Sequence, residues 1–393
     1  MRCGARTLLG LFSTAAVLVL FQDGAVRAQP GGRSLDATER LLEELTNAHG
    51  VPGFEGPVRD ILRREWRDLL TDLHTDGLGN LIGSFQGQTE SPRILLMAHL
   101  DEVGFLVRHI DAQGFIYVHN VGGHFDQSVL TQRLSILTAR GEVLGYTGMK
   151  SGHILRPAER DRMIPLQDMF LDVGARSRAE VEAMGVRPGL PVTYATRFEA
   201  LNGTGRYLAK AWDDRVGLAV ITQALQQLKS TGHPNNVQVA ATVQEEIGLR
   251  GASVVQASAR ADIVINLEIG IASDFPLLTS PTLSQEELGK GPGIFVFDGS
   301  MIPNNNYVEW ILRVAKESGI PIQFESVTGY GEDAAMIQKS GQGIPAVNIG
   351  VPTRYGHSQS GVIDRGDYDH TVKLVVEMIK RLSASEVASI REF

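Results

Sequence analysis

The sequence predicts an α/β fold, in which helices cover a mixed β-sheet and a smaller β-rich module is inserted into the larger domain. Two observations lead to this prediction. Helical and strand patterns alternate before residue 105 and again after residue 208, which is typical of an α/β sheet. Between about residues 105 and 201, short apolar runs are separated by glycine-containing turns, as in a small β-rich unit.

Each element is predicted from the spacing of its apolar residues. Helices are expected at 35–49, 57–70, 216–228, 308–316 and 372–382. Strands are expected in the larger domain at 80–83, 94–98, 237–243, 263–267 and 344–349. The module is expected to hold strands at 105–107, 115–118, 134–137 and 170–173, and a short helix at 177–184. The larger domain would then comprise residues 29–105 and 202–393, and the module residues 106–201.

Composition excludes several classes of protein. The chain has 393 residues, of which 43% are hydrophobic, and this is ample for a packed core. Its net charge is −8 and no basic patch stands out, so neither nucleic acid nor an anionic membrane is expected as a partner. The single cysteine, Cys3, lies close to the N-terminus. No cysteine-based metal site or nucleophile is therefore expected.

The first 28 residues have the pattern of a secretory signal peptide. Arg2 and Arg6 precede an uncharged apolar run at 8–21, and residues 25–28 supply small side chains at the spacing of a cleavage site. The run is shorter than the ~20 residues that cross a bilayer, so cleavage is expected rather than a retained anchor. This pattern predicts a secreted or periplasmic protein without a membrane anchor in its mature form.

Histidine and carboxylate side chains follow several of the expected buried strands. The carboxyl ends of strands in an open α/β sheet meet at one crevice, so these side chains are expected to gather at one edge. Acids placed directly after apolar strands are costly to bury unless they are paired or bind a metal. The side chains concerned are His99 and Asp101, Asp213, Glu245 and Glu246, Glu268, and His357.

This inventory suits two divalent ions such as Zn²⁺, Co²⁺ or Mn²⁺. A two-metal site needs one carboxylate that bridges ions ~3.5–4 Å apart. Each ion then takes one histidine and one further carboxylate. His99, Asp213, Glu246, Glu268 and His357 supply this set with no residue left over. Glu245 remains as a carboxylate that could act as general base toward a metal-bound water.

At these motifs the sequence resembles the M42 family of metallo-aminopeptidases, the group that includes glutamyl aminopeptidase and the twelve-subunit TET peptidases. The resemblance runs in order through nearly the whole chain after residue 28. Four motifs in order are far more specific than any one of them. The matching stretches are 98–104, 210–217, 242–252 and 352–358, together with 185–189 in the module.

The resemblance implies a three-layer catalytic domain of the zinc-exopeptidase type. It implies that the module at 106–201 is a PDZ-like or barrel-like dimerisation domain. The activity implied is the release of N-terminal residues from peptides, in a homo-oligomer based on dimers and as large as a dodecamer. Peptides would then be the substrates, and two divalent metal ions per subunit would be the cofactors.

The family pattern also implies a role for each site residue. His99 and Glu268 would hold one ion, Glu246 and His357 the other, and Asp213 would bridge them. Asp101 would orient His99, and Glu245 would be the catalytic base. The wider clan joins the pair that corresponds to Asp213 and Asp214 by a cis peptide bond.

The sequence departs from the family pattern at two places. Glu268 stands where the family usually has aspartate, and the extra methylene moves the carboxylate by roughly 1–1.5 Å. In the loop at 331–335 the family tends to have a Thr-Asp-Ala-Gly type sequence. Asp333 matches this sequence, but its neighbours differ, so both metal preference and substrate selectivity could differ from those of relatives.

Three other functions remain open. A deblocking or acylaminoacyl hydrolase could use the same metal centre. An endoglucanase-type glycoside hydrolase would need only two carboxyls ~5–9.5 Å apart, without two histidines and three further acids. A non-catalytic binding protein would be expected to have lost a ligand or the base, and none is missing here.

Overall fold

The computed structural model describes Met1 and residues 34–258, 260–276 and 286–392. The chain divides into two compact units, Met1–Asp36 and Ala37–Phe393, and every helix and strand below lies in the second. Apart from Met1, the segment predicted as a signal peptide lies outside the described residues. Within the described ranges, no helix is both long and apolar enough to cross a membrane.

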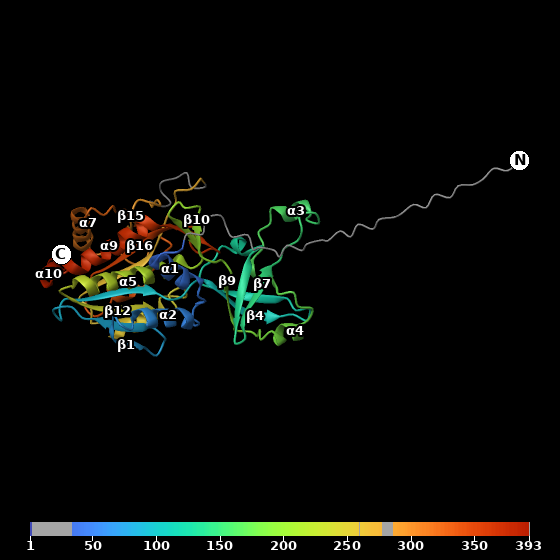
Figure 1. The fold of residues 1–393 in the computed structure, drawn as a ribbon, viewed down its shortest axis with the longest axis horizontal. Helices are drawn as coiled ribbons and strands as arrows, with labels where there is room; N and C mark the ends of the chain where they lie inside the picture. Colours follow the sequence, from blue (N-terminus) through green and yellow to red (C-terminus); the bar gives the residue numbers. More distant parts are fainter. Residues whose placement is uncertain (2–33, 259, 277–285, 393) are drawn as a thin grey trace. The chain divides into compact units, whose positions relative to one another are not determined.

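A mixed sheet of 11 strands, counted over the described residues, forms the larger part of the second unit (Figure 1). Its four central strands are parallel to one another, and the strands at its margins are antiparallel to their neighbours. In spatial order the strands are β1 (Thr71–Thr75), β2 (Leu81–Phe85), β12 (Asn236–Thr242), β3 (Arg93–His99), β13 (Ile263–Ile271), β16 (Ala346–Arg354), β17 (Gly361–Asp364), β11 (Arg206–Ala209) and β10 (Glu199–Leu201). Strands β14 (Gly293–Phe297) and β15 (Gln323–Ser326) branch from β16.

The central strands are buried almost throughout. In β3, every residue after Arg93 is buried, as expected of a parallel strand covered on both faces. Its Leu95 and Met97 pack into one apolar cluster with residues of α6 (Arg250–Ser258) and α8 (Ala334–Gln338). The long helix α5 (Trp212–Thr231) packs along β3 and β13. The predicted alternation of helices and strands is thus confirmed, and it produces a mixed α/β fold.

The remaining helices of this part pack mainly on other helices. Helices α1, α2 and α9 contact α5, while α7 contacts α9 and α10. The indole Nε1 of Trp66, at the end of α2, donates a hydrogen bond of 2.9 Å to Thr222 Oγ1 in α5, which fixes α2 on α5. The bounds are α1 (Ala37–Asn47), α2 (Gly56–Trp66), α7 (Asn305–Ser318), α9 (Arg365–Arg381) and α10 (Ala384–Ile390).

The β-rich module is a closed barrel of six strands, as the short apolar runs and turns in this segment lead one to expect. Its interior is filled by buried side chains such as Phe105, Ile116, Leu134 and Val192. In order around the barrel the strands are β4 (Gly104–Ile110), β5 (Ile116–Val121), β8 (Leu171–Asp172), β7 (Gly141–Thr147), β6 (Arg133–Thr138) and β9 (Pro191–Tyr194). Short helices α3 (Pro157–Arg160) and α4 (Arg178–Ala183) and the 3₁₀ turns Asp126–Val129 and Leu166–Asp168 connect them.

The register of the parallel strands aligns His99 and Glu268 across the sheet. His99 of β3 pairs with Thr242 of β12, and Met97 pairs with Asn266 of β13. Glu268, two residues beyond Asn266, therefore comes level with His99. The predicted strand at 263–267 is too short, because pairing with β16 carries β13 on to Ile271. Glu268 accordingly lies inside a strand rather than after one.

Candidate metal centre

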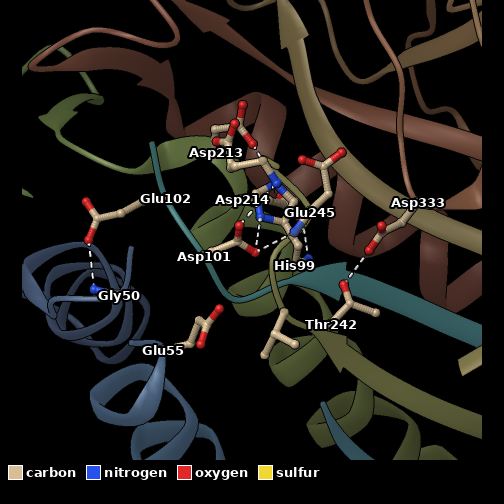
Figure 2. Close-up of polar contacts among 12 residues, drawn as sticks. Gly50, Glu55, His99, Asp101, Glu102, Asp213, Asp214, Thr242, Glu245 and Asp333 are labelled. Atoms are coloured by element: carbon tan, nitrogen blue, oxygen red, sulfur yellow. Dashed lines mark hydrogen bonds and ion pairs between the residues drawn. The ribbon is translucent and has the colours of Figure 1, made fainter. Parts of the chain in front are cut away.

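The structure brings all seven predicted site residues together at the carboxyl ends of the parallel strands. Figure 2 shows four of them, His99, Asp101, Asp213 and Glu245, clustered beyond the end of β3. The crevice rule for open α/β sheets explains this convergence of segments that are far apart in sequence. His99 ends β3, Asp101 follows it, Asp213 lies in the first turn of α5, Glu245 and Glu246 follow β12, Glu268 lies in β13, and His357 follows β16.

The carboxylate of Asp213 lies between the two histidines. Its Oδ1 is 2.8 Å from Nε2 of His99, and its Oδ2 is 3.1 Å from Nε2 of His357. On the first side, Oε1 of Glu268 is 3.7 Å from the same His99 nitrogen. On the second side, Oε2 of Glu246 is 3.6 Å from the His357 nitrogen. Two groups of one histidine and one glutamate thus share Asp213, with one of its oxygens facing each group.

Both groups are compatible with metal binding. In each, the potential ligand atoms all lie within 4.8 Å of one another, and the groups are His99, Asp213 and Glu268, and Asp213, Glu246 and His357. Imidazole nitrogens and carboxylate oxygens together suit first-row divalent ions. Oε1 of Glu246 is buried and, among the described residues, has no hydrogen-bond partner, so a buried acceptor remains for a cation.

The proton position on His357 also suits a ligand. Its Nδ1 lies 3.0 Å from the carbonyl oxygen of Gly123, which can only accept a hydrogen bond. Nδ1 therefore carries a proton, and Nε2 would be the nitrogen that binds a metal ion placed between it, Asp213 and Glu246. A metal-binding histidine is commonly held in this way by its second nitrogen. Gly123 belongs to the loop that follows β5, so the barrel supplies one of the contacts of the site.

Asp101 connects His99 to the glutamate pair. Its Oδ1 accepts the backbone N–H of Glu245 at 3.0 Å (Figure 2). Its Oδ2 accepts the backbone N–H of Glu246 at 3.1 Å. Its Oδ1 also lies 3.6 Å from Nδ1 of His99, an ion-pair distance rather than a hydrogen bond. The family pattern implied the contact with His99 but not the two backbone contacts. Asp101 therefore positions the loop that carries Glu245 and Glu246 as well as the side chain of His99.

We expect the substitution Asp101→Asn to weaken metal binding by about 10- to 100-fold. The amide has one acceptor oxygen, so it can hold only one of the two backbone N–H groups and carries no charge toward His99. Metal affinity can be measured by competition with a chromogenic chelator. Asp111→Asn is a matched control, because Asp111 Oδ1 accepts two backbone N–H groups, of Gln113 and Phe115, in a turn of the barrel. If Asp101→Asn and Asp111→Asn had equal metal affinity, Asp101 would have no role in supporting the metal ligands.

Asp214 orients the backbone around the site. It is joined to Asp213 by a cis peptide bond, as the resemblance implies. Its Oδ2 accepts the N–H of His99 at 3.2 Å, and its Oδ1 accepts that of Gly217 at 3.0 Å. A side chain at Gly217 would collide with the Asp214 carboxylate, so this position needs glycine. Asp214 thus ties the end of β3 to the first turn of α5.

The cluster carries more negative charge than its own residues can compensate. Burial raises the pKa of Glu245 well above its usual range, in spite of the nearby His99. Burial likewise raises the pKa of Glu246 to about 8, in spite of His357. Burial lowers the pKa of His99, but Glu268 and the other carboxylates around it outweigh this effect and raise the pKa well above the usual histidine value. A divalent cation would relieve this repulsion directly.

A buried ion pair between Glu102 and Lys210 lies beside the site. It was not predicted from the sequence. The carboxylate of Glu102 accepts hydrogen bonds from Lys210 Nζ at 2.8 and 2.7 Å, from the N–H of Gly50 at 3.0 Å and from Thr193 Oγ1 at 2.8 Å. These partners lie on three separate segments, including strand β9 of the barrel. Glu102 and Lys210 lie inside the stretches 98–104 and 210–217, which match the family pattern. Their position in these motifs was the one sign in the sequence that they belong near the site.

A cavity of about 330 Å³ opens onto the cluster. Part of its wall is the loop between β15 and α8, which sequence reasoning had marked only as a departure from the family pattern. In that loop, Asp333 accepts a hydrogen bond from Thr242 Oγ1 of β12 (Figure 2). The lining residues are Gly123, Asp213, Glu245, Glu246, Gly248, Leu249, Glu268, Gly329, Tyr330, Gly331, Glu332 and His357.

The fold, with its mixed sheet and closed barrel, is similar to that of solved aminopeptidase structures. A TET aminopeptidase from a marine sediment archaeon, Thaumarchaeota archaeon SCGC AB-539-E09, is 37% identical, with a TM-score of 0.87, over 90% of this chain and 100% of that one. The TET1 peptidase of Pyrococcus horikoshii, described as able to assemble into a tetrahedron or a large octahedral shell, is 30% identical, with a TM-score of 0.79, over 88% of this chain and 100% of that one.

The family model described as M42 glutamyl aminopeptidase matches residues 79–374, and the chain belongs to this family. The putative aminopeptidase FrvX of Escherichia coli K12 is 33% identical over 358 residues, which are 90% of this chain and 98% of the relative. The protein is therefore a hydrolase of the aminopeptidase type. M42 aminopeptidases depend on metal ions, in agreement with the two candidate ligand groups.

The prediction of a secreted or periplasmic protein is wrong by these comparisons. The relatives concerned, FrvX and the TET peptidases, are cytosolic aminopeptidases. The prediction depended on a local pattern alone, two arginines before an uncharged apolar run at 8–21 and the spacing of a cleavage site at 25–28. That run lies outside the described residues, so the structure gives it no support.

Proposed function

We propose that the protein removes N-terminal residues from peptides with a pair of divalent metal ions bridged by Asp213. The observation that carries this proposal is the position of Asp213, whose two oxygens lie 2.8 and 3.1 Å from nitrogens of two different histidines. A carboxylate placed in this way can hold two ions at the spacing of a two-metal hydrolase. Membership of an aminopeptidase family supplies the reaction.

Each ion would have its own ligands besides Asp213. His99 and Glu268 would hold one, and His357 and Glu246 the other, and Zn²⁺, Co²⁺ and Mn²⁺ all suit such ligands. When bound, the ions would polarise the scissile carbonyl and make a water molecule acidic. Glu268 reaches this position from inside β13, although it is one methylene longer than the family's usual aspartate.

Glu245 would move the proton. It lines the same cavity as the ligands but belongs to neither ligand group. Its carboxylate would accept a proton from the attacking water as the new C–O bond forms. It would then give that proton to the departing amine as the C–N bond breaks, so that one residue serves as base and then as acid. Asp101 would keep Glu245 in place by accepting a hydrogen bond from the backbone N–H of Glu245.

The barrel would join subunits. We propose residues 106–201 as a dimerisation domain, and residues 29–105 and 202–393 as the catalytic domain. Leu144 and Tyr146 of β7 and Met149 just after it are about half exposed, so they could contribute apolar contacts to a subunit interface. TET relatives form large oligomers. Light scattering of the purified protein is expected to give a dimer or a multiple of it, and a monomer would contradict this proposal.

Removal of metal is expected to abolish hydrolysis of aminoacyl p-nitroanilides, and addition of Zn²⁺, Co²⁺ or Mn²⁺ is expected to restore it. The reason is that carbonyl polarisation and water activation are both lost with the ions. The experiment uses the full chain, stripped with a chelator, dialysed, and assayed with each metal on a panel of first residues.

The same experiment separates the alternatives. If no free-amine substrate is hydrolysed with any metal, the aminopeptidase proposal fails. Hydrolysis of N-acylated peptides alone would indicate a deblocking enzyme with the same metal centre. Hydrolysis of a polysaccharide that resists the chelator would indicate a glycoside hydrolase.

A further inference from the structure

Glu332 is a buried carboxyl group without a partner. It lies on the loop between β15 and α8, in the wall of the cavity, and its exposed fraction is 1%. Neither of its carboxylate oxygens has a hydrogen-bond partner among the residues that the structure describes. The hydroxyl of Tyr330, two residues earlier in the same wall, also lacks one within the described part of the chain. Polar groups buried in this way are costly unless a ligand satisfies them.

The loop that carries Glu332 is held in a defined place. Asp333 is fixed to Thr242 of β12, as described above, and the ring of Tyr330 stacks on Phe295 of β14 at 5.8 Å. Gly299 has a φ of +87°, and a Cβ there would lie 2.5 Å from the carbonyl oxygen of Thr328. The absence of that Cβ lets the loop pack closely on the turn below it. The unpartnered groups therefore belong to a loop that is packed against β12 and β14.

The cavity wall is rich in carboxyl groups. Its lining includes no lysine or arginine among the described residues. Glu332 belongs to neither ligand group, and burial together with nearby carboxylates raises its pKa well above the usual range, so a cation that pairs with it would stabilise its charged form.

We infer that Glu332, together with the Tyr330 hydroxyl, receives the positively charged side chain of substrates that begin with lysine or arginine. This inference depends on the proposed function. The substrate's α-ammonium group is bonded to the carbon next to the scissile carbonyl, so it must lie beside the metal ligands. A lysine ammonium lies roughly 6 Å farther out, at the end of a four-carbon stem, and can reach a carboxylate outside both ligand groups.

This arrangement selects against other first residues. A cationic side chain forms a charge-assisted hydrogen bond with the carboxylate. A leucine side chain leaves the same carboxyl buried and unpaired, and a glutamate side chain adds repulsion. Sites built around a buried polar group reject ligands that cannot pair with it.

The test compares kcat/KM of the metal-loaded wild type and of Glu332→Gln on lysine, arginine, leucine and glutamate p-nitroanilides. The wild type is expected to prefer lysine and arginine. The variant is expected to lose about 10- to 100-fold in kcat/KM on these two and to stay within about threefold on leucine. Glu287→Gln is the matched control, because it removes the same charge from an exposed position outside the cavity, and it is expected to match the wild type.

A second measurement needs no variant. The wild type is expected to hydrolyse the p-nitroanilide of Nε-acetyl-lysine at least about tenfold less efficiently than that of lysine, because acetylation removes the charge. Equal efficiency on both would overturn the inference. Equal losses on lysine and leucine in Glu332→Gln would assign Glu332 to the α-ammonium group instead, and no loss would exclude contact. If the wild type hydrolysed no substrate with a free amino group, the proposed function itself would be wrong.

Discussion

Replacing Glu245 with glutamine is expected to lower kcat by about 10²- to 10⁴-fold while metal content stays unchanged. Glutamine has nearly the same shape, but it cannot accept the proton of the attacking water. Glu245 belongs to neither group of ligand atoms, so the ions should remain bound. Steady-state kinetics and elemental analysis of the same dialysed sample measure the two quantities together.

The neighbouring residue provides the control for this experiment. Glu246→Gln changes the same chemistry at the adjacent position of the same loop, but Glu246 belongs to the ligand group with His357. This variant is expected to lose metal as well as activity. If Glu245→Gln kept kcat within about threefold of the wild type, another group would have to serve as the base, and the mechanism proposed here would be wrong.

Replacing Asp213 with asparagine is expected to remove both metal ions and, with them, the activity. A carboxylate can offer an oxygen to each ion, whereas the amide offers one oxygen and a nitrogen that cannot coordinate. We expect affinity to fall at least about 100-fold at both positions, since Asp213 is a direct ligand rather than an outer contact. Elemental analysis after dialysis gives the number of ions per chain.

Glu268→Gln distinguishes a bridge from an ordinary ligand. Of the two ligand groups, Glu268 belongs to the one with His99, at 3.7 Å, so its loss is expected to weaken one position and leave the other filled. Circular dichroism of both variants would verify that the fold is intact. Retention of one full equivalent of metal by Asp213→Asn would contradict the bridging role of Asp213.

The centre of the fold could be predicted because buried parallel strands leave a strong local pattern. The run at 94–98 is apolar without interruption, as a strand covered on both faces must be. The polar residues that follow such strands then indicate the crevice. This rule predicts from the sequence that His99, Glu246 and His357 lie together, although the last two are more than 100 residues apart.

The remaining features depend on tertiary pairing that no local pattern records. Strand β7 alternates only weakly between buried and exposed positions, and β9 begins with Pro191, so neither was predicted. Strand β13 continues past Glu268 only because β16 lies beside it. Nothing in the sequence around Glu332 shows that its carboxyl would be buried without a partner, since this follows from the packing of three separate segments.

The hydrogen bond from His357 Nδ1 to the Gly123 carbonyl makes the module a participant in the chemistry. The two residues are 234 positions apart, yet the barrel backbone determines which imidazole nitrogen is free to bind a metal. Neighbouring Gly122 has a φ of +85°, and a Cβ there would lie 3.2 Å from Oε2 of Glu246. Substitutions at Gly122 or Gly123 should therefore have the same effect as active-site mutations. A recombination that exchanged the barrel between relatives would also have to exchange the loop that carries His357.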